Sequence, residues 1–125
     1  MTLALLQVAL GGALGAVCRF AVGGSVLRLV GPGFPLGTVV VNVLGSFLMG
    51  VFVVAAAQRG LTHLSPLVMT GLLGGFTTFS AFSLDAVSLF ERGSTGLAAL
   101  YVAGSVAASL LGLVLGLAVA RGIWA

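Results

Sequence analysis

The chain has 125 residues, of which 60% are apolar and 6% are charged. Soluble domains carry about 25% charged residues, so this composition excludes an ordinary soluble domain and indicates an integral membrane protein. The net charge of +3 comes from five arginines against Asp85 and Glu91. These arginines form no basic patch, which excludes a nucleic-acid-binding protein. The single cysteine, Cys18, excludes an intramolecular disulfide.

Four apolar segments are long enough to cross a membrane, which predicts an all-α protein with one integral membrane domain over residues 1–125. A turn at residues 31–35, with two prolines and two glycines, separates the first from the second. The second carries no charge and spans roughly 33 Å, about one hydrocarbon core. In chain order the four segments are residues 3–29, 36–57, 64–90 and 96–120.

The third segment contains a stretch that a helix crossing lipid does not need. Gly74 and Gly75 are adjacent, and threonines, serines and phenylalanines follow them within residues 76–83. Paired glycines lower helix propensity and let the backbone leave helical geometry at small steric cost. Non-helical backbone at membrane depth must be satisfied by protein or by a water-filled cavity. We therefore interpret residues 70–85 as a broken transmembrane helix whose break is functional.

The charges at the two ends of the predicted bundle do not set its orientation. With four crossings, Arg59 and Arg121 lie on one side of the membrane, and Arg28 and Arg92 lie on the other. Orientation usually follows an excess of positive charge in the cytoplasmic loops, and that excess is absent here. The chain can then insert both ways, and oppositely inserted copies would pair as an antiparallel homodimer. A bias supplied by lipid or by Arg19 is the alternative.

Small residues recur every four positions in the first and fourth segments. Such residues let helices approach closely in a membrane, where lipid removes the hydrophobic force between them. We therefore expect tight helix contacts along two stripes: Gly11 and Gly15, with Gly12 and Ala16 beside them, and Gly104, Ala108, Gly112 and Gly116.

Polar groups also lie inside the second and fourth segments. The Asn42 carboxamide offers two N–H donors, which suit an anion that must shed water; a contact between helices is the alternative. Tyr101, Ser105 and Ser109 recur every four residues and so share one face. A row of hydroxyls can pass a small ion by replacing its hydration step by step. Each serine alone would more often bond to its own helix.

Phe76, Phe79 and Phe82 are three residues apart, so we expect them to share a face after the break. Aromatic rings carry a positive edge, which can meet an anion without a fixed charge; core packing is the alternative. Unwound carbonyl groups from Gly74 to Thr77 have the opposite polarity and suit a hard monovalent cation. A tight helix crossing without a metal is the alternative there.

Arg19 is the most costly residue of the first segment. A central membrane arginine costs about 2.5–3.5 kcal/mol on insertion scales, so it must face a partner, a cavity or the interface. Asp85 is the only acid inside a span that could pair with it. Without such a partner, Arg19 would raise the concentration of anions at the mouth of a pore.

Three motifs together resemble a known family. Residues 11–19 (GGALGAVCR), 37–45 (GTVVVNVLG) and 74–82 (GGFTTFSAF) are similar to the three signatures of the Fluc (CrcB) fluoride channels, in the same order. The resemblance implies a four-helix subunit with a broken third helix, which forms a dual-topology antiparallel homodimer in the lipid bilayer. It also implies two parallel fluoride pores and a central structural sodium ion. Ala81 is a departure, because threonine is common there in the family.

The resemblance further implies roles for individual residues. Arg19 would belong to a vestibule, and the carbonyl groups of Gly74 and Thr77 would hold the sodium ion. The fluoride pore would be formed by Asn42, Thr78, Phe79, Ser80, Phe82, Tyr101, Ser105 and Ser109.

For such a channel the implied function is passive export of fluoride from the cytoplasm across the inner (plasma) membrane. Hydrogen fluoride, a weak acid, enters from acidic surroundings and dissociates inside. The membrane potential, negative inside, then drives the anion outward. No nucleotide or pump motif is present in the sequence, and we expect no enzymatic activity.

A small proton-coupled multidrug exporter subunit is the alternative function. It would need a carboxylate deep in a span, whereas Asp85 lies near one end of the third segment. A membrane hydrolase is less suitable because no serine occupies a nucleophile-elbow pattern. A structural subunit of a larger complex would not need the phenylalanine, threonine and serine residues that follow Gly75.

Overall fold

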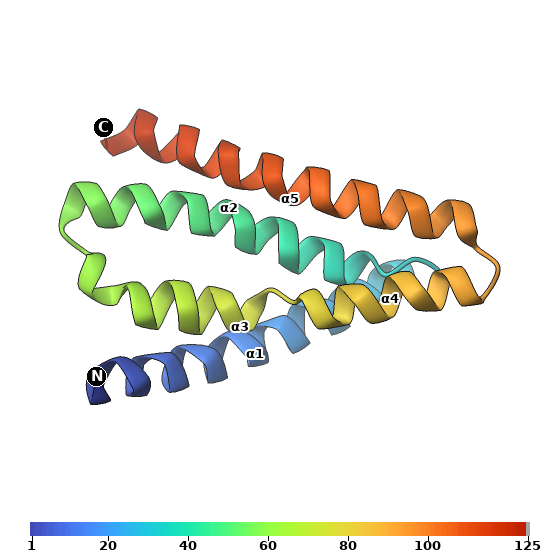
Figure 1. Cartoon of the computed structure of the whole chain (residues 1–125), viewed down its shortest axis with the longest axis horizontal. Coiled ribbons are helices and arrows are strands. Elements are labelled where there is room, and N and C mark those ends of the chain that lie inside the picture. Colours follow the sequence, from blue (N-terminus) through green and yellow to red (C-terminus); the bar gives the residue numbers. More distant parts are fainter. Residues whose placement is uncertain (125) are drawn as a thin grey trace.

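The computed structural model describes residues 1–124, and this part of the chain folds into helices joined by short turns (Figure 1). Four stretches are long and apolar enough to cross a membrane, which confirms the predicted all-α fold. The third is built from several elements. In chain order the elements are α1 (Thr2–Val30), α2 (Leu36–Arg59), η1 (Thr62–Leu64), the π-helical η2 (Pro66–Leu73), α3 (Gly74–Phe76), α4 (Phe79–Glu91) and α5 (Thr95–Trp124).

The chain runs back and forth along the long axis of the molecule (Figure 1). The N-terminus, the α2–η1 link and the C-terminal end of α5 lie at one end, and the other two links lie at the opposite end. α2 and α5 run in the same direction and pack along their length, while α1 packs mainly against η2 and α3. The third span therefore lies between α1 on one side and the α2–α5 pair on the other.

Glycines make these close contacts possible, as the small-residue stripes predicted. A Cβ added at Gly116 would overlap the Phe47 carbonyl oxygen, and one at Gly112 would lie 3.1 Å from the Val43 carbonyl oxygen. Gly11 and Gly15 of α1 are buried against the backbone of η2 in the same way. Gly104 differs, because no atom lies within 4 Å of a Cβ placed there.

The break in the third span lies at Thr77 and Thr78, whose backbones are extended (φ −90°, ψ 160° and φ −151°, ψ 124°). This corrects the expectation that Gly74 and Gly75 leave helical geometry, because both belong to helix α3 and Gly74 has φ −63° and ψ −37°. The small size of Gly75 serves packing instead. A Cβ on Gly75 would lie 2.7 Å from the Gly12 carbonyl oxygen, so the glycine lets α1 and α3 cross in contact.

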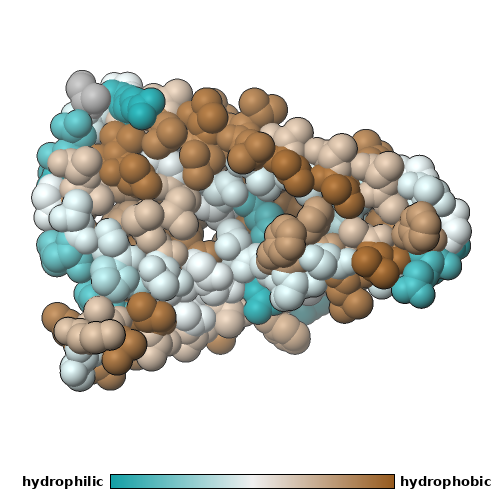
Figure 2. Space-filling model, in the orientation of Figure 1, coloured by the Kyte–Doolittle hydropathy of each residue, from teal (hydrophilic) through white to brown (hydrophobic). Residues whose placement is uncertain are grey.

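Most of the surface of one copy is apolar. In the most apolar part of each membrane-spanning stretch, no more than 33% of the residues are buried within the chain. Hydrophilic residues lie mainly at the two ends of the molecule, and apolar side chains cover much of α5 between them (Figure 2). Lipid or further protein must cover this apolar belt.

Candidate functional site

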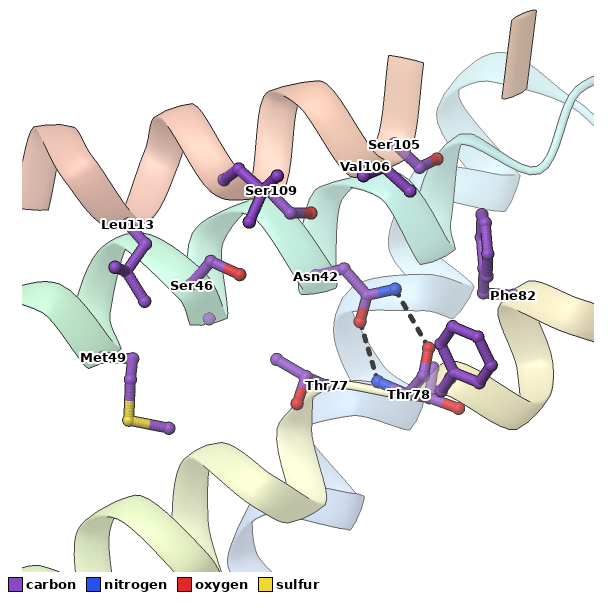
Figure 3. Close-up of a pocket in the computed structure, with 13 residues that line it drawn as sticks. Asn42, Ser46, Met49, Thr77, Thr78, Phe82, Ser105, Val106, Ser109 and Leu113 are labelled. Atoms are coloured by element: carbon purple, nitrogen blue, oxygen red, sulfur yellow. Dashed lines mark hydrogen bonds between the residues drawn. The ribbon is translucent and has the colours of Figure 1, made fainter. Parts of the chain in front are cut away.

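Asn42, in the second turn of α2, holds the break in place. Its Nδ2 donates to the Thr78 carbonyl oxygen at 3.0 Å, and the Thr78 N–H donates to Asn42 Oδ1 at 2.7 Å (Figure 3). The Thr78 hydroxyl accepts the Ala81 N–H at 3.1 Å and so caps the start of α4. One of the two N–H groups on Asn42 Nδ2 is used in this clamp, and the other is available to a further acceptor.

A groove of about 400 Å³ lies between α2, the break and α5. It brings together six of the eight predicted pore residues: Asn42, Thr78, Phe79, Phe82, Ser105 and Ser109. Tyr101 and Ser80 are not part of its lining. The full lining of this groove is Asn42, Gly45, Ser46, Met49, Thr77, Thr78, Phe79, Phe82, Ser105, Val106, Ser109, Leu110 and Leu113.

Two polar or polarizable residues of the groove were not among the predicted pore residues. Ser46 lies one helical turn after Asn42 on α2, and Met49 lies almost one turn further. Their spacing of four and seven residues from Asn42 is the signal that places them on its face. Thr77 also lines the groove with its side chain, whereas only its carbonyl group was assigned a role from the sequence.

The Ser105 hydroxyl is the least satisfied polar group of the groove. Ser105 is 5% exposed, and its Oγ has no hydrogen-bond partner in residues 1–124. Figure 3 shows Ser109 one turn further along α5, above Asn42 in this view. Because burying an unpaired hydroxyl is unfavourable, Ser105 Oγ is a polar group whose hydrogen-bonding capacity is unused within these residues.

Phe79 and Phe82 begin α4 and differ sharply in burial. Phe79 is 78% exposed and Phe82 is 8% exposed, and their ring centroids are 5.5 Å apart. Phe76 does not share their face, contrary to the expectation from spacing, because the extended residues of the break come between them. It is buried beside Gly45 and serves packing.

Tyr101 departs from the predicted row of free hydroxyls. It is buried with Phe82 and Leu89, and its hydroxyl donates to Asp85 Oδ2 at 3.0 Å. The Thr38 hydroxyl donates to the same carboxylate oxygen at 2.7 Å. Asp85 is therefore stabilised by two hydroxyl groups and not by Arg19.

Arg19 reaches the break from α1. Its Nε donates to the Gly75 carbonyl oxygen at 3.1 Å, and the side chain is half-buried and outside the lining of the groove. A cation beside the last carbonyls of a helix is favourable, because these groups carry the negative end of the helix dipole. Arg19 thus supplies a hydrogen bond that the interrupted helix cannot provide.

The break also removes helical donors from two other carbonyl groups. In a continuous helix the Gly74 and Thr77 oxygens would accept the N–H groups of residues 78 and 81. Those N–H groups bind Asn42 Oδ1 and the Thr78 hydroxyl instead. Oxygens freed in this way are typical ligands of a hard cation. Within residues 1–124, no cluster of three or more His, Cys, Asp or Glu side chains offers another metal site.

Comparison with known proteins agrees with this architecture. The model of the family "CrcB-like protein, Camphor Resistance (CrcB)" matches residues 6–117. A protein of Ruegeria sp. (strain TM1040) named Fluoride-specific ion channel FluC is 63% identical over 124 residues, which cover 98% of each chain. A protein of the same name from Jannaschia sp. (strain CCS1) is 74% identical over 96 residues, 77% of this chain and 91% of the relative. One from Agrobacterium fabrum is 50% identical over 119 residues, 94% and 95% of the two chains.

These matches confirm the resemblance seen in the three motifs, and they extend it over nearly the whole chain. The chain therefore belongs to the CrcB (FluC) family, a family of multi-pass membrane ion channels and not of enzymes.

Proposed function

We propose that the protein is a passive, fluoride-selective channel that exports fluoride from the cytoplasm across the inner (plasma) membrane. The observation that carries this proposal is the buried Ser105 hydroxyl, which lacks a partner and belongs to a residue that lines the same groove as Asn42 and Phe82. All three groups offer a positive pole to an anion without a fixed charge. The names of the relatives give the anion, fluoride.

The groove provides successive contacts for a dehydrated anion. Ser109 and Ser105 offer hydroxyl groups one turn apart, and Asn42 offers its second N–H between them and the break. The Phe79 and Phe82 ring edges then receive the anion at the start of α4. Thr78 and Ser80, whose hydroxyl oxygens are 3.3 Å apart, add polar groups beside Phe79. Tyr101 contributes its ring behind Phe82.

The working unit in this proposal is an antiparallel dual-topology homodimer. In one copy the groove is open on one side, so its polar groups would face lipid, which is unfavourable. The Phe79 ring beside it is also largely exposed. A second copy would cover both features. Arg28 and Arg92 lie at one end of the bundle, and Arg59 and Arg121 lie at the other, so neither orientation is favoured by charge. Two copies bring two grooves, and hence two pores.

A central structural sodium ion fits the chemistry of the break. The Gly74 and Thr77 carbonyl groups have lost their helical donors, and Arg19 occupies only the Gly75 carbonyl between them. When bound, a sodium ion would supply the positive charge that these oxygens lack, and copies related by a twofold axis would share it. In the same proposal Arg19 raises the concentration of anions in the vestibule.

No energy source other than the ion's own gradient is required. A membrane potential that is negative inside favours outward movement of one negative charge by about 2.3 kcal/mol per 100 mV. The proton-coupled exporter is not supported, because Asp85 is bound by Thr38 and Tyr101 and does not line the groove.

Fluoride efflux from vesicles that contain only the purified protein tests the proposal. Vesicles loaded with potassium fluoride are diluted into fluoride-free buffer, and a potassium ionophore is added to balance the charge. We expect rapid efflux from the native protein, none from Phe82→Ile, and native rates from Phe20→Ile. Phe20 is the matched control because it is 83% exposed on α1, away from the groove. Vesicles of native protein that retain their fluoride would refute the proposal.

The dimer and the sodium ion need separate measurements. With Cys18 replaced by serine, Gln58→Cys and Thr95→Cys place single thiols at opposite ends of the bundle. Dual topology predicts that an impermeant maleimide labels about half of each variant in sealed cells; labelling of one variant alone would contradict it. Replacing sodium by N-methylglucamine should weaken the dimer on size-exclusion chromatography, and an unchanged dimer would argue against a structural sodium ion.

A further inference from the structure

Four aromatic rings form a continuous row from the break to the turn at residues 31–35. The Phe79 and Phe82 ring centroids are 5.5 Å apart, and those of Phe82 and Tyr101 are 5.2 Å apart. The row continues from Tyr101 to Phe34 at 5.5 Å, where the two ring planes meet at 85°. Such separations and angles are typical of favourable aromatic pairs.

Phe34 belongs to a link between helices, yet its ring points into the protein. It is half-buried and packs against the core cluster that contains Phe82 and Tyr101. Gly31 begins the turn with φ 81°, and the Leu36 N–H donates to the Phe34 carbonyl oxygen at 2.7 Å just before α2 begins. Pro35 restricts the backbone between them. The turn therefore holds the Phe34 ring in a defined position.

Tyr101 is held in two independent ways. Its hydroxyl is anchored on Asp85 Oδ2 at 3.0 Å, and its ring lies between Phe34 and Phe82. With 1% of its surface exposed, it has no contact with the groove and no room to move while both neighbours are present. Without the Phe34 ring, Tyr101 would stay anchored at its hydroxyl, but its ring could tilt toward the vacated space. Phe82 would then lose the surface behind it.

We propose that Phe34 is a positioning residue of the anion path, which acts through Tyr101 to fix the ring edge that Phe82 presents to the groove. The proposal rests on the proposed function, because it takes Phe82 as a contact of the transported anion. A ring-edge contact depends strongly on orientation, since the same ring presents a negative face when it turns. A small tilt of Phe82 therefore changes both the rate and the choice of anion.

Phe34→Leu tests this positioning role, with Phe34→Tyr as the variant that retains a ring. Phe90→Leu is the matched control, because Phe90 is 62% exposed on the last turn of α4 and belongs to no ring pair of the row. We expect Phe34→Leu to lower fluoride efflux about two- to tenfold, as for loss of one aromatic pair. We also expect a smaller ratio of fluoride to chloride efflux. Phe34→Tyr and Phe90→Leu should keep native values of both.

A double substitution separates positioning from loss of fold. In a Tyr101→Leu background, adding Phe34→Leu should produce no further loss of efflux, because the connection to Phe82 is already broken. Additive losses, or native efflux and selectivity in Phe34→Leu, would overturn the proposal. If native protein conducts and Phe82→Ile does not, either result removes only the role of Phe34. If native protein fails to conduct, the proposed function itself fails.

Discussion

Ser105→Ala separates a functional hydroxyl from a structural one, because it should change stability and transport in opposite directions. The Ser105 Oγ is buried and has no partner within residues 1–124. A buried donor without a partner costs about 1–3 kcal/mol of stability, and alanine removes the hydroxyl while it keeps the β-carbon. We therefore expect Ser105→Ala to raise the free energy of unfolding by roughly 1 kcal/mol. Most single substitutions lower it by a similar amount, so the direction of the change is informative.

The effect on transport follows from the same hydroxyl. A hydrogen bond to a charged group contributes about 1.5–3 kcal/mol, and each 1.4 kcal/mol corresponds to roughly tenfold in rate. If Ser105 donates to fluoride as the anion passes the groove, Ser105→Ala should lower efflux by about tenfold or more. The hydroxyl would then be kept for transport, at the expense of stability in the empty channel.

Thermal unfolding in detergent and fluoride efflux from vesicles measure the two effects. Ser25→Ala is the matched control, because the exposed Ser25 hydroxyl already donates to the Ala21 carbonyl oxygen of its own helix at 2.8 Å. It should change neither quantity. A lower melting temperature together with native efflux for Ser105→Ala would show that the hydroxyl has a structural partner, and it would remove Ser105 from the anion path.

Other substitutions test the clamp, the helix contacts and the arginine. Asn42→Asp should abolish efflux and lower the melting temperature, because a carboxylate repels the anion and loses the donor to the break; native efflux would contradict this. Gly116→Ala should destabilise by about 1–3 kcal/mol because its methyl group overlaps the Phe47 carbonyl. Gly104→Ala, in open space inside α5, should instead stabilise by about 0.5–1 kcal/mol in thermal unfolding, because alanine favours the helix over glycine. Arg19→Met should destabilise by about 0.5–1.5 kcal/mol, since it removes the donor to the half-buried Gly75 carbonyl; an unchanged melting temperature would show that this bond contributes nothing.

The four spans were predictable because hydropathy and length alone identify a membrane helix. The groove was largely predictable because Ser105 and Ser109 share a helical face by spacing, and because Asn42 is an expensive residue in an uncharged span. The position of the break was not. Glycine propensity favoured Gly74 and Gly75, but both residues stay helical, and Gly75 packs against α1. The hydrogen bonds of Asn42 and Thr78 accompany the extended backbone at residues 77 and 78 instead.

The hydrogen-bond partners of the charged groups could not be predicted from the sequence either. Arg19 and Asp85 looked like the one possible ion pair inside the spans, because no other acid lies there. The structure satisfies each with neutral groups: a backbone carbonyl for Arg19, and the hydroxyls of Thr38 and Tyr101 for Asp85. These contacts join residues 16 to 56 positions apart, and no local pattern encodes which helix faces meet.

The result is a groove without any charged residue in its lining. Conduction requires binding that is strong enough to replace hydration and weak enough to release the ion. A guanidinium group in the groove would strengthen binding, but it would also hold the anion in place. Arg19 is instead directed to the Gly75 carbonyl, and the Asp85 carboxylate is covered by two hydroxyl groups. In the proposed channel the anion would therefore meet a series of dipoles and ring edges, each of which attracts it moderately and none of which neutralises it.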